Sequence, residues 1–268
     1  MPRSLTTVHG VDFSAARDPG RRIFVASGTR RPGGTLSIRA VRSAASLTGG
    51  AADRDAAIAA LRAFVAAAGP CVVGIDFPFG LPVETTGGER WTEFARAFGD
   101  RYEDAGAFRD SCRKKCRGRE RRRAADDEAR APFSPWNLRV YRQTFFGVRD
   151  LLAPLVRERR ARVVPMQRPL ADLPAVVEAC PASTLKAAGL YVPYKGAAPS
   201  LARARRRIVN WIEAAARVDL SPGARATNVA DPGGDALDSV LAASAASRAA
   251  SDLRAARPEH AIEGRIYA

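Results

Sequence analysis

Several features that mark common protein classes are missing from this chain of 268 residues. Its four Cys are unevenly spaced, which argues against the disulfide framework of a small secreted domain. No run reaches 18 apolar residues, because Arg62 interrupts the longest one, and the N-terminus lacks an apolar stretch of signal-peptide length. We therefore expect a cytoplasmic protein without a membrane-spanning segment.

Familiar catalytic motifs are also absent. The chain has no G-x-x-x-x-G-K-[ST] phosphate loop, no G-x-S-x-G elbow and no H-E-x-x-H zinc motif. The C-x-x-x-C pair at Cys112 and Cys116 lacks two further ligands nearby, so it is a weak zinc signal. Only two His are present, and we expect His9 to be a satisfied residue of a strand rather than a catalytic base.

Acidic residues are too few to balance the basic ones. The chain has 43 Lys and Arg against 28 Asp and Glu, which gives a net charge of +15. An excess of this size favours a polyanionic partner through phosphate contacts and counterion release. We therefore expect nucleic acid as the partner, although a basic surface can also serve solubility alone.

One short acidic motif occurs twice. Gly10–Phe13 (GVDF) recurs as Gly74–Phe77 (GIDF), and each copy ends an apolar run. A lone ionised Asp in a buried strand is costly unless something pairs with it. In neighbouring strands, the carboxylates of Asp12 and Asp76 would lie about 5 Å apart. A divalent cation would remove the repulsion between them, so the motif predicts a metal site on a sheet.

The hydrophobic pattern predicts a mixed α/β domain. Three strands joined by Gly- and Pro-rich turns favour an antiparallel meander. A right-handed strand–helix–strand crossover would then bring a continuous apolar strand parallel to the first one. The predicted strands are Thr6–Phe13, Arg22–Ser27, Thr35–Val41, Cys71–Phe77, Val163–Met166 and Ala175–Cys180, and the predicted helices are Asp53–Ala68, Gln143–Arg160, Ser200–Arg217 and Asp235–Ala250.

The segment of about residues 84–161 differs from its surroundings. It is Arg-rich, carries scattered aromatic residues and lacks strand periodicity. We expect it to be a mostly helical basic insertion within one domain that spans residues 1–268.

Three further carboxylates stand in conspicuous places. Glu178 lies on a predicted strand, while Asp235 and Asp238 are three positions apart and share one face of the last helix. With Asp12 and Asp76 they would form the oxygen-rich cage that Mg²⁺ or Mn²⁺ prefers. Each acid also has a structural alternative, as a turn or helix cap or, for Glu178, as the partner of an Arg.

Two basic clusters offer contacts to a phosphate backbone. One is Arg109–Arg123, and the other contains Lys195 together with Arg203 and Arg207, which share a helix face. Each is equally consistent with a solvated run of surface charge.

Motifs in a fixed order resemble the "domain of unknown function 429" family. The ordered set spans nearly the whole chain and is more specific than any single motif. The matching segments are GVDFSAA at 10–16, IDFPFGLP at 75–82, APFSPWNLRVYRQT at 131–144, EACPAS at 178–183, DALDS at 235–239 and EGRIY at 263–267.

The resemblance implies a predicted nuclease with a ribonuclease-H-like fold, in which helices cover both faces of a five-stranded mixed sheet. In that superfamily a strand-one Asp, a strand-four acid and an Asp of the final helix hold metal ions. These roles fall on Asp12, on Asp76 and on Asp235 or Asp238, while Glu178 matches the family motif without an assigned role.

The implied chemistry is two-metal phosphodiester hydrolysis with Mg²⁺ or Mn²⁺. Asp12 would bridge the ions, one ion would activate water, and the other would stabilise the leaving 3′ oxygen. Arg139, Arg142 and Thr144 match the inner motif and are expected to contact substrate phosphates. The D-x-x-D pair also resembles that of Holliday-junction resolvases, which are dimers, so a homodimer is a further expectation.

Two other functions fit the same residues. An actin-like phosphotransferase shares the core fold and its strand-one Asp, but it needs Gly-rich phosphate turns and a second core, for which 268 residues are short. A non-catalytic module that binds nucleic acid or a protein partner would retain the acids for structure alone.

Overall fold

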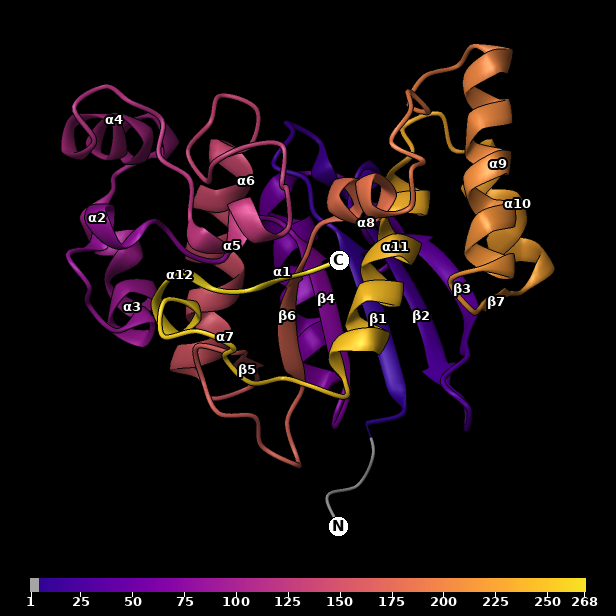
Figure 1. The fold of residues 1–268 in the computed structure, drawn as a ribbon, viewed down its shortest axis with the longest axis horizontal. Helices are drawn as coiled ribbons and strands as arrows, with labels where there is room; N and C mark the ends of the chain where they lie inside the picture. The colour runs from indigo at the N-terminus through magenta and orange to yellow at the C-terminus, as the bar shows by residue number, and fades with distance from the viewer. Residues whose placement is uncertain (1–4) are drawn as a thin grey trace.

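The structure is a computed structural model, and it describes residues 5–268. A mixed sheet lies at the centre, with helices on both faces (Figure 1). The strands are β1 (Thr7–Asp12), β2 (Phe24–Arg30), β3 (Leu36–Ser43), β4 (Val72–Asp76), β5 (Arg162–Val163), β6 (Ala175–Ala179), β7 (Val218–Leu220) and β8 (Ile266–Tyr267).

The strand order is β5-β6-β4-β1-β2-β3-β7, and β8 pairs with β6. Strands β1, β2 and β3 form the expected antiparallel meander, and β4 lies parallel to β1 as the crossover rule predicts. The five-stranded sheet implied by the family resemblance is too small. Strands β7 and β8 were not expected, because two or three residues are too few to show an alternating pattern.

Twelve α-helices surround the sheet in the part of the chain described. None of the helices within residues 5–268 is both long enough and apolar enough to cross a membrane. The helices are α1 (Arg54–Ala67), α2 (Val83–Thr86), α3 (Trp91–Arg101), α4 (Ala105–Lys115), α5 (Ala124–Glu128), α6 (Tyr141–Phe146), α7 (Ala153–Arg157), α8 (Pro181–Ala187), α9 (Pro199–Ala214), α10 (Pro222–Ala230), α11 (Asp235–Ala249) and α12 (His260–Glu263).

Local sequence signals explain several helix ends. The Asp53 side chain accepts a hydrogen bond from the backbone N–H of Ala56 and caps α1, as predicted. The helix expected over Gln143–Arg160 forms as α6, a π-helical turn over Gly147–Leu152, and α7. Pro154 follows that turn and has no N–H to donate, which disfavours a regular α-helix there.

Each face of the sheet has its own apolar core. Val11 and Ile75 point to the face covered by α1, α3 and the π-helical turn. Val8 and Val72 point to the other face, which α9 and α11 cover. Because side chains alternate along a strand, Gly10, Asp12 and their counterparts in β4 face α11.

The glycine of each acidic motif lies where α11 crosses the sheet. A Cβ on Gly10 would lie 2.1 Å from backbone atoms of α11, and a Cβ on Gly74 would lie 2.5 Å from them. Only glycine therefore lets the helix rest directly on β1 and β4. This contact brings the N-terminal turn of α11 beside the ends of both strands.

We expect Gly10→Ala to lower the free energy of unfolding by about 3 kcal/mol, because the added methyl group forces α11 away from β1. Gly223→Ala in α10 is the matched control, since nothing lies within 4 Å of its added Cβ. The control should change stability by no more than about 0.5 kcal/mol. Denaturant unfolding measures both values, and equal stability of the two variants would contradict the close packing of α11.

Candidate functional site

A pocket of about 820 Å³ opens at the carboxyl ends of β1, β4 and β6. The helical region, which follows β4 and covers about residues 84–161, contributes residues 131–133, 139, 140 and 143 to its wall. The segment Tyr191–Lys195 lines another side. The carboxyl ends of strands in open α/β sheets are a common place for ligands. The pocket is therefore the first candidate for a functional site.

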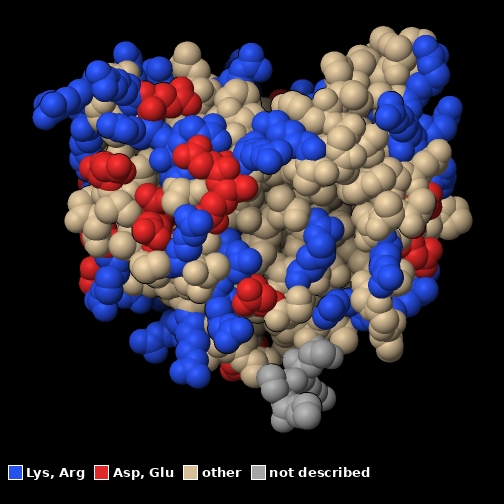
Figure 2. Space-filling view, viewed as in Figure 1, with Lys and Arg blue, Asp and Glu red and all other residues tan. Residues whose placement is uncertain are grey.

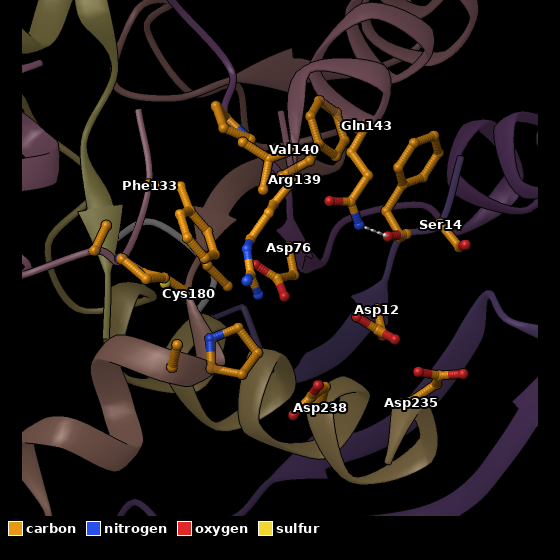
Figure 3. Close-up of a pocket in the computed structure, with 18 of the residues that line it drawn as sticks. Asp12, Ser14, Asp76, Phe133, Arg139, Val140, Gln143, Cys180, Asp235 and Asp238 are labelled. Atoms are coloured by element: carbon orange, nitrogen blue, oxygen red, sulfur yellow. Dashed lines mark hydrogen bonds between the residues drawn. The ribbon is translucent and has the colours of Figure 1, made fainter. Parts of the chain in front are cut away.

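Four carboxylates from three elements gather at one end of this pocket (Figure 3). Asp12 ends β1 and Asp76 ends β4, and the parallel register places the two residues directly opposite each other. Asp235 and Asp238 come from the first turn of α11. The acids that the sequence predicted to meet, apart from Glu178, thus form one cluster.

Two of these carboxylates have partners. Asp238 accepts a hydrogen bond from the Tyr194 hydroxyl at 2.6 Å and pairs with Lys195 Nζ at 2.6 Å. Asp235 lies 3.2 Å from a guanidinium nitrogen of Arg22 and 3.8 Å from Lys195 Nζ. Both are held by cations from connecting segments, Arg22 just before β2 and Lys195 between α8 and α9.

The other two carboxylates lack such partners. Within residues 5–268, no side-chain hydrogen bond or ion pair reaches the carboxylate of Asp12 or Asp76. Asp12 is only 6% exposed. Burial raises the pKa of Asp12, with Lys195 opposing the shift and Asp238 adding to it. Burial likewise raises the pKa of Asp76 to about 8.

Lys195 is the cation that stands among the carboxylates. Burial alone would lower its pKa, but Asp238 and Asp12 outweigh that effect and raise it. Arg205 of α9 fixes the backbone around Lys195, because its guanidinium donates to the carbonyls of Tyr194 at 2.7 Å and Gly196 at 2.9 Å. The side chain predicted to bind phosphate therefore serves as a counter-ion of the acids.

The chemistry of the carboxylate side chains suits a divalent cation, but their present arrangement does not form a metal site. Among the residues described, no group of three or more His, Cys, Asp or Glu is arranged so that it could hold a metal ion. The site nevertheless offers carboxylate oxygens only, two of them on unpartnered side chains, which is the chemistry that Mg²⁺ and Mn²⁺ prefer. Asp238 would have to exchange Lys195 for the metal.

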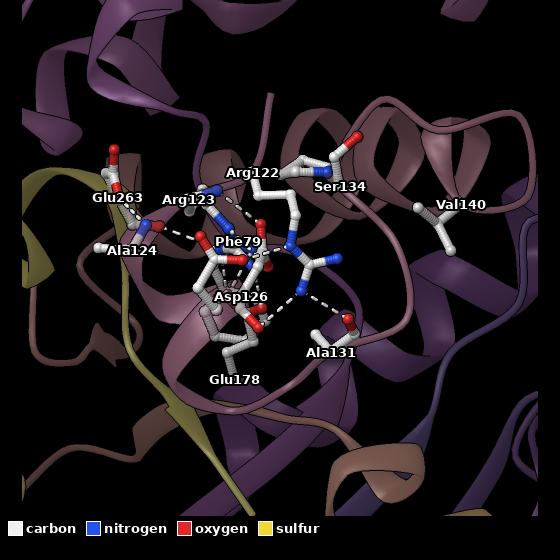
Figure 4. Close-up of polar contacts among 12 residues, drawn as sticks. Phe79, Arg122, Arg123, Ala124, Asp126, Ala131, Ser134, Val140, Glu178 and Glu263 are labelled. Atoms are coloured by element: carbon white, nitrogen blue, oxygen red, sulfur yellow. Dashed lines mark hydrogen bonds and ion pairs between the residues drawn. The ribbon is translucent and has the colours of Figure 1, made fainter. Parts of the chain in front are cut away.

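Glu178 lies at the pocket but belongs to another network. The register pairs Glu178 of β6 with Ile75, so its side chain points to the face opposite that of Asp76. Its carboxylate there accepts two hydrogen bonds from the buried Arg123 guanidinium, at 2.6 and 2.8 Å, and one from the Phe79 N–H at 2.9 Å (Figure 4). The structure thus gives Glu178 the alternative expected role, as the partner of an Arg, and not a place among the four Asp.

Comparison with known protein families found one match that covers most of the chain. The model of a family described as a protein of unknown function (DUF429) matches residues 10–263. The chain belongs to the DUF429 family. The match includes both copies of the acidic motif and both Asp of α11. No curated protein and no solved structure matches the chain.

The residues of this DUF429 protein that were predicted to bind phosphate lie in different places. Arg139 and Lys195 line the pocket. Thr144 is fully buried and donates to the Pro135 carbonyl at 2.6 Å, so its hydroxyl is not available to a substrate. The remaining three are exposed outside the pocket lining: Arg142, Arg203 and Arg207. Figure 2 shows basic side chains spread over the face in view, with acidic ones between them.

Two groups outside the acidic cluster have structural roles. His9 Nδ1 lies 2.9 Å from Ser27 Oγ, and burial lowers its pKa to about 4, so His9 is a satisfied strand residue as expected. Cys112 and Cys116 are buried free thiols. Burial raises the pKa of Cys112 to about 12, which keeps its thiol protonated.

Some residues of the site carried no sequence signal. Tyr194 and Arg22 hold the acids of α11, but neither belongs to a motif and Arg is abundant throughout the chain. Gln143 does belong to the motif at 131–144, but its contact is structural, because it donates to the Phe13 carbonyl at 2.6 Å and so ties α6 to the end of β1. Only the fold shows these contacts.

We expect Asp76→Asn to raise the stability of the metal-free protein at pH 8, by about 1–2 kcal/mol, because it removes a half-buried carboxylate without a partner. The folded-state pKa of Asp76 lies above its ordinary value of 3.8, at about 8. Its carboxyl therefore stabilises the fold fully below pH 3.8, and this contribution is lost as the pH rises toward 8. The advantage of the variant should accordingly shrink at pH 4.

Asp238→Asn is the control, because the same substitution there removes the partner of Lys195 and should lower stability. Thermal unfolding in EDTA at both pH values measures the effects. A destabilised Asp76→Asn variant at pH 8 would show that Asp76 has a stabilising partner in solution.

Proposed function

We propose that this DUF429 protein is a nuclease that uses Mg²⁺ or Mn²⁺ and hydrolyses phosphodiester bonds of nucleic acid. The observation that carries the proposal is the meeting of Asp12, Asp76, Asp235 and Asp238 at one pocket, with the first two unpartnered. A buried carboxylate without donors is costly, so a fold that keeps two of them side by side is typical of a functional site.

The charges around the acids support a phosphate-bearing substrate. Arg22, Arg139 and Lys195 all line the same pocket as the carboxylates. The chain as a whole carries a net charge of +15, which attracts a polyanion. A positively charged rim around an acidic centre suits a substrate whose phosphate is attacked at that centre.

The four Asp side chains would hold the ions, and Asp12 would contribute to this ligand set from the end of the central strand. Bound divalent ions would supply an activated water and stabilise the leaving oxygen. Lys195 would leave Asp238 and pair with a substrate phosphate, while Arg139 would orient the next phosphate. These steps use only side chains that line the pocket.

The arrangement of the sheet supports the finer fold assignment that we propose, a ribonuclease-H-like domain. An antiparallel meander, a crossover helix, a parallel fourth strand and a final helix with acids at its start follow one another in the expected order. The homodimer stays a prediction, which the mass of the protein in solution would test.

One observation favours a second candidate, a non-catalytic module that binds nucleic acid. Lys195 already neutralises Asp238 at 2.6 Å, and no preformed metal group exists among residues 5–268. In such a module the acids would anchor the Tyr191–Lys195 segment and the Arg side chains would bind phosphates. Metal binding separates the two candidates.

We expect Mn²⁺ to raise the melting temperature of the EDTA-treated wild type and to leave that of Asp12→Asn unchanged, because only the wild type keeps the central ligand. Radiolabelled DNA, RNA and branched substrates should be cleaved with Mg²⁺ or Mn²⁺, and not with EDTA or by the variant. Absence of both the shift and the cleavage would leave the binding module as the function.

We also expect Lys195→Met to tighten Mn²⁺ binding about tenfold, because it removes the cation that competes for Asp238. Lys186→Met is the matched control, since Lys186 lies over the Tyr191 ring and, within residues 5–268, forms no ion pair with the four Asp. Titration calorimetry measures both affinities. Weaker binding in Lys195→Met than in the control would rule out competition between the lysine and the metal.

A further inference from the structure

The half of the pocket away from the four Asp has a different character. Apart from Arg123, Asp126 and Glu178, which pair with one another, its lining is largely apolar and aromatic, and Arg139 also lines it. The apolar lining residues are Phe133, Val140, Cys180, Pro181, Tyr191 and Pro193. Metal binding and phosphate contacts at the acidic end do not explain this half.

Two aromatic rings in this half are accessible to a ligand. Tyr191 is 53% exposed, and among the described residues it is the only exposed large hydrophobic that lines the pocket; the other two are Leu138 and Leu170. Phe133 is half-buried. A cation lies near each ring: the Arg139 guanidinium carbon is 5.5 Å from the Phe133 centroid, and Lys186 Nζ is 5.0 Å from the Tyr191 centroid.

Accessible aromatic rings with cations beside them are what proteins use to stack bases of single-stranded nucleic acid. Every base has a flat face, so such stacking is worth about 1–3 kcal/mol per base and tolerates any sequence. Apolar side chains around the rings exclude water and strengthen the stacking.

Arg139 connects the two halves of the pocket. In the view of Figure 3 its side chain lies between Phe133 and Asp76, and its guanidinium carbon is 5.5 Å from the Phe133 centroid. A base on the Phe133 ring would therefore place its phosphate near the Arg139 guanidinium and next to the carboxylates.

We propose that the apolar half of the pocket binds one unstacked nucleobase of a single-stranded nucleic acid, between Phe133 and Tyr191. The inference rests on the proposed function and names its substrate class. A pocket of about 820 Å³ has the size of a small-ligand site and cannot admit a duplex. A paired nucleotide would first have to leave its stack, at a cost of a few kcal/mol.

The test uses an oligonucleotide that carries one 2-aminopurine, whose fluorescence falls when it stacks on an aromatic ring. It is titrated with the full-length protein in Ca²⁺ and in EDTA, as a single strand and as a duplex. We expect strong quenching and binding with the single strand and at least tenfold weaker binding with the duplex.

Phe133→Leu and Tyr191→Leu should each weaken binding of the single strand about fivefold or more and reduce the quenching, because they remove a ring and keep apolar volume. Leu138→Ala is the matched control, since Leu138 is 67% exposed outside the pocket lining. Unchanged melting temperatures would show that all three variants are folded. Equal binding of duplex and single strand, or no effect of either ring, overturns the inference.

The outcomes also separate this inference from the nuclease proposal. Cleavage that requires metal and Asp12 but ignores both rings leaves the nuclease standing and removes the base site. Quenching that depends on the rings without any metal-dependent cleavage keeps the base site and removes the nuclease.

Discussion

The close contact of α11 with the two central strands decides where the acidic side chains meet. Gly10 and Gly74 let the helix backbone rest on β1 and β4, where a Cβ would lie 2.1 and 2.5 Å from it. Two residues further along each strand, Asp12 and Asp76 point to the same face. The first turn of α11 then brings Asp235 and Asp238 to them, so one packing contact assembles four carboxylates from distant parts of the chain.

This assembly places more negative charge in a buried site than the site itself can balance. Lys195 and Tyr194 bind Asp238, and Arg22 binds Asp235. Asp12 and Asp76 have no direct partner and interact with Lys195 only through longer-range electrostatics. Burial raises the pKa of both. Single substitutions that would relieve such an unfavourable arrangement are readily available. A protein that keeps the arrangement nonetheless is therefore expected to need it for function. The instability of the site is therefore itself an argument for a ligand.

The sequence predicted the acids that local motifs and the crossover rule bring together. It did not predict which face of the sheet Glu178 points to, because that depends on the register between β4 and β6. The duplicated motif and the crossover rule together placed Asp12 beside Asp76, and the register confirms this. Glu178 lies on a strand as expected, and the structure places this strand beside β4. There Glu178 pairs with Ile75, and a shift of one residue moves a side chain to the other face. Thr144 was expected to contact phosphate because it matches the inner family motif, whereas its hydroxyl donates to the Pro135 carbonyl inside the helical region.

The Arg123 network explains how walls from separate parts of the chain form one rigid pocket. Arg123 is fully buried, and its guanidinium binds Asp126, Glu178 and the Glu263 carbonyl, so it joins the helical region, β6 and the C-terminal segment (Figure 4). Arg122 donates to the Ala131 carbonyl at 2.7 Å, two residues before Phe133. Breaking a buried ion pair costs about 3–5 kcal/mol, so the helical region cannot easily swing away from the sheet. The aromatic wall is thereby held at a fixed place relative to the four Asp, which a site that positions one nucleotide over a reactive centre requires.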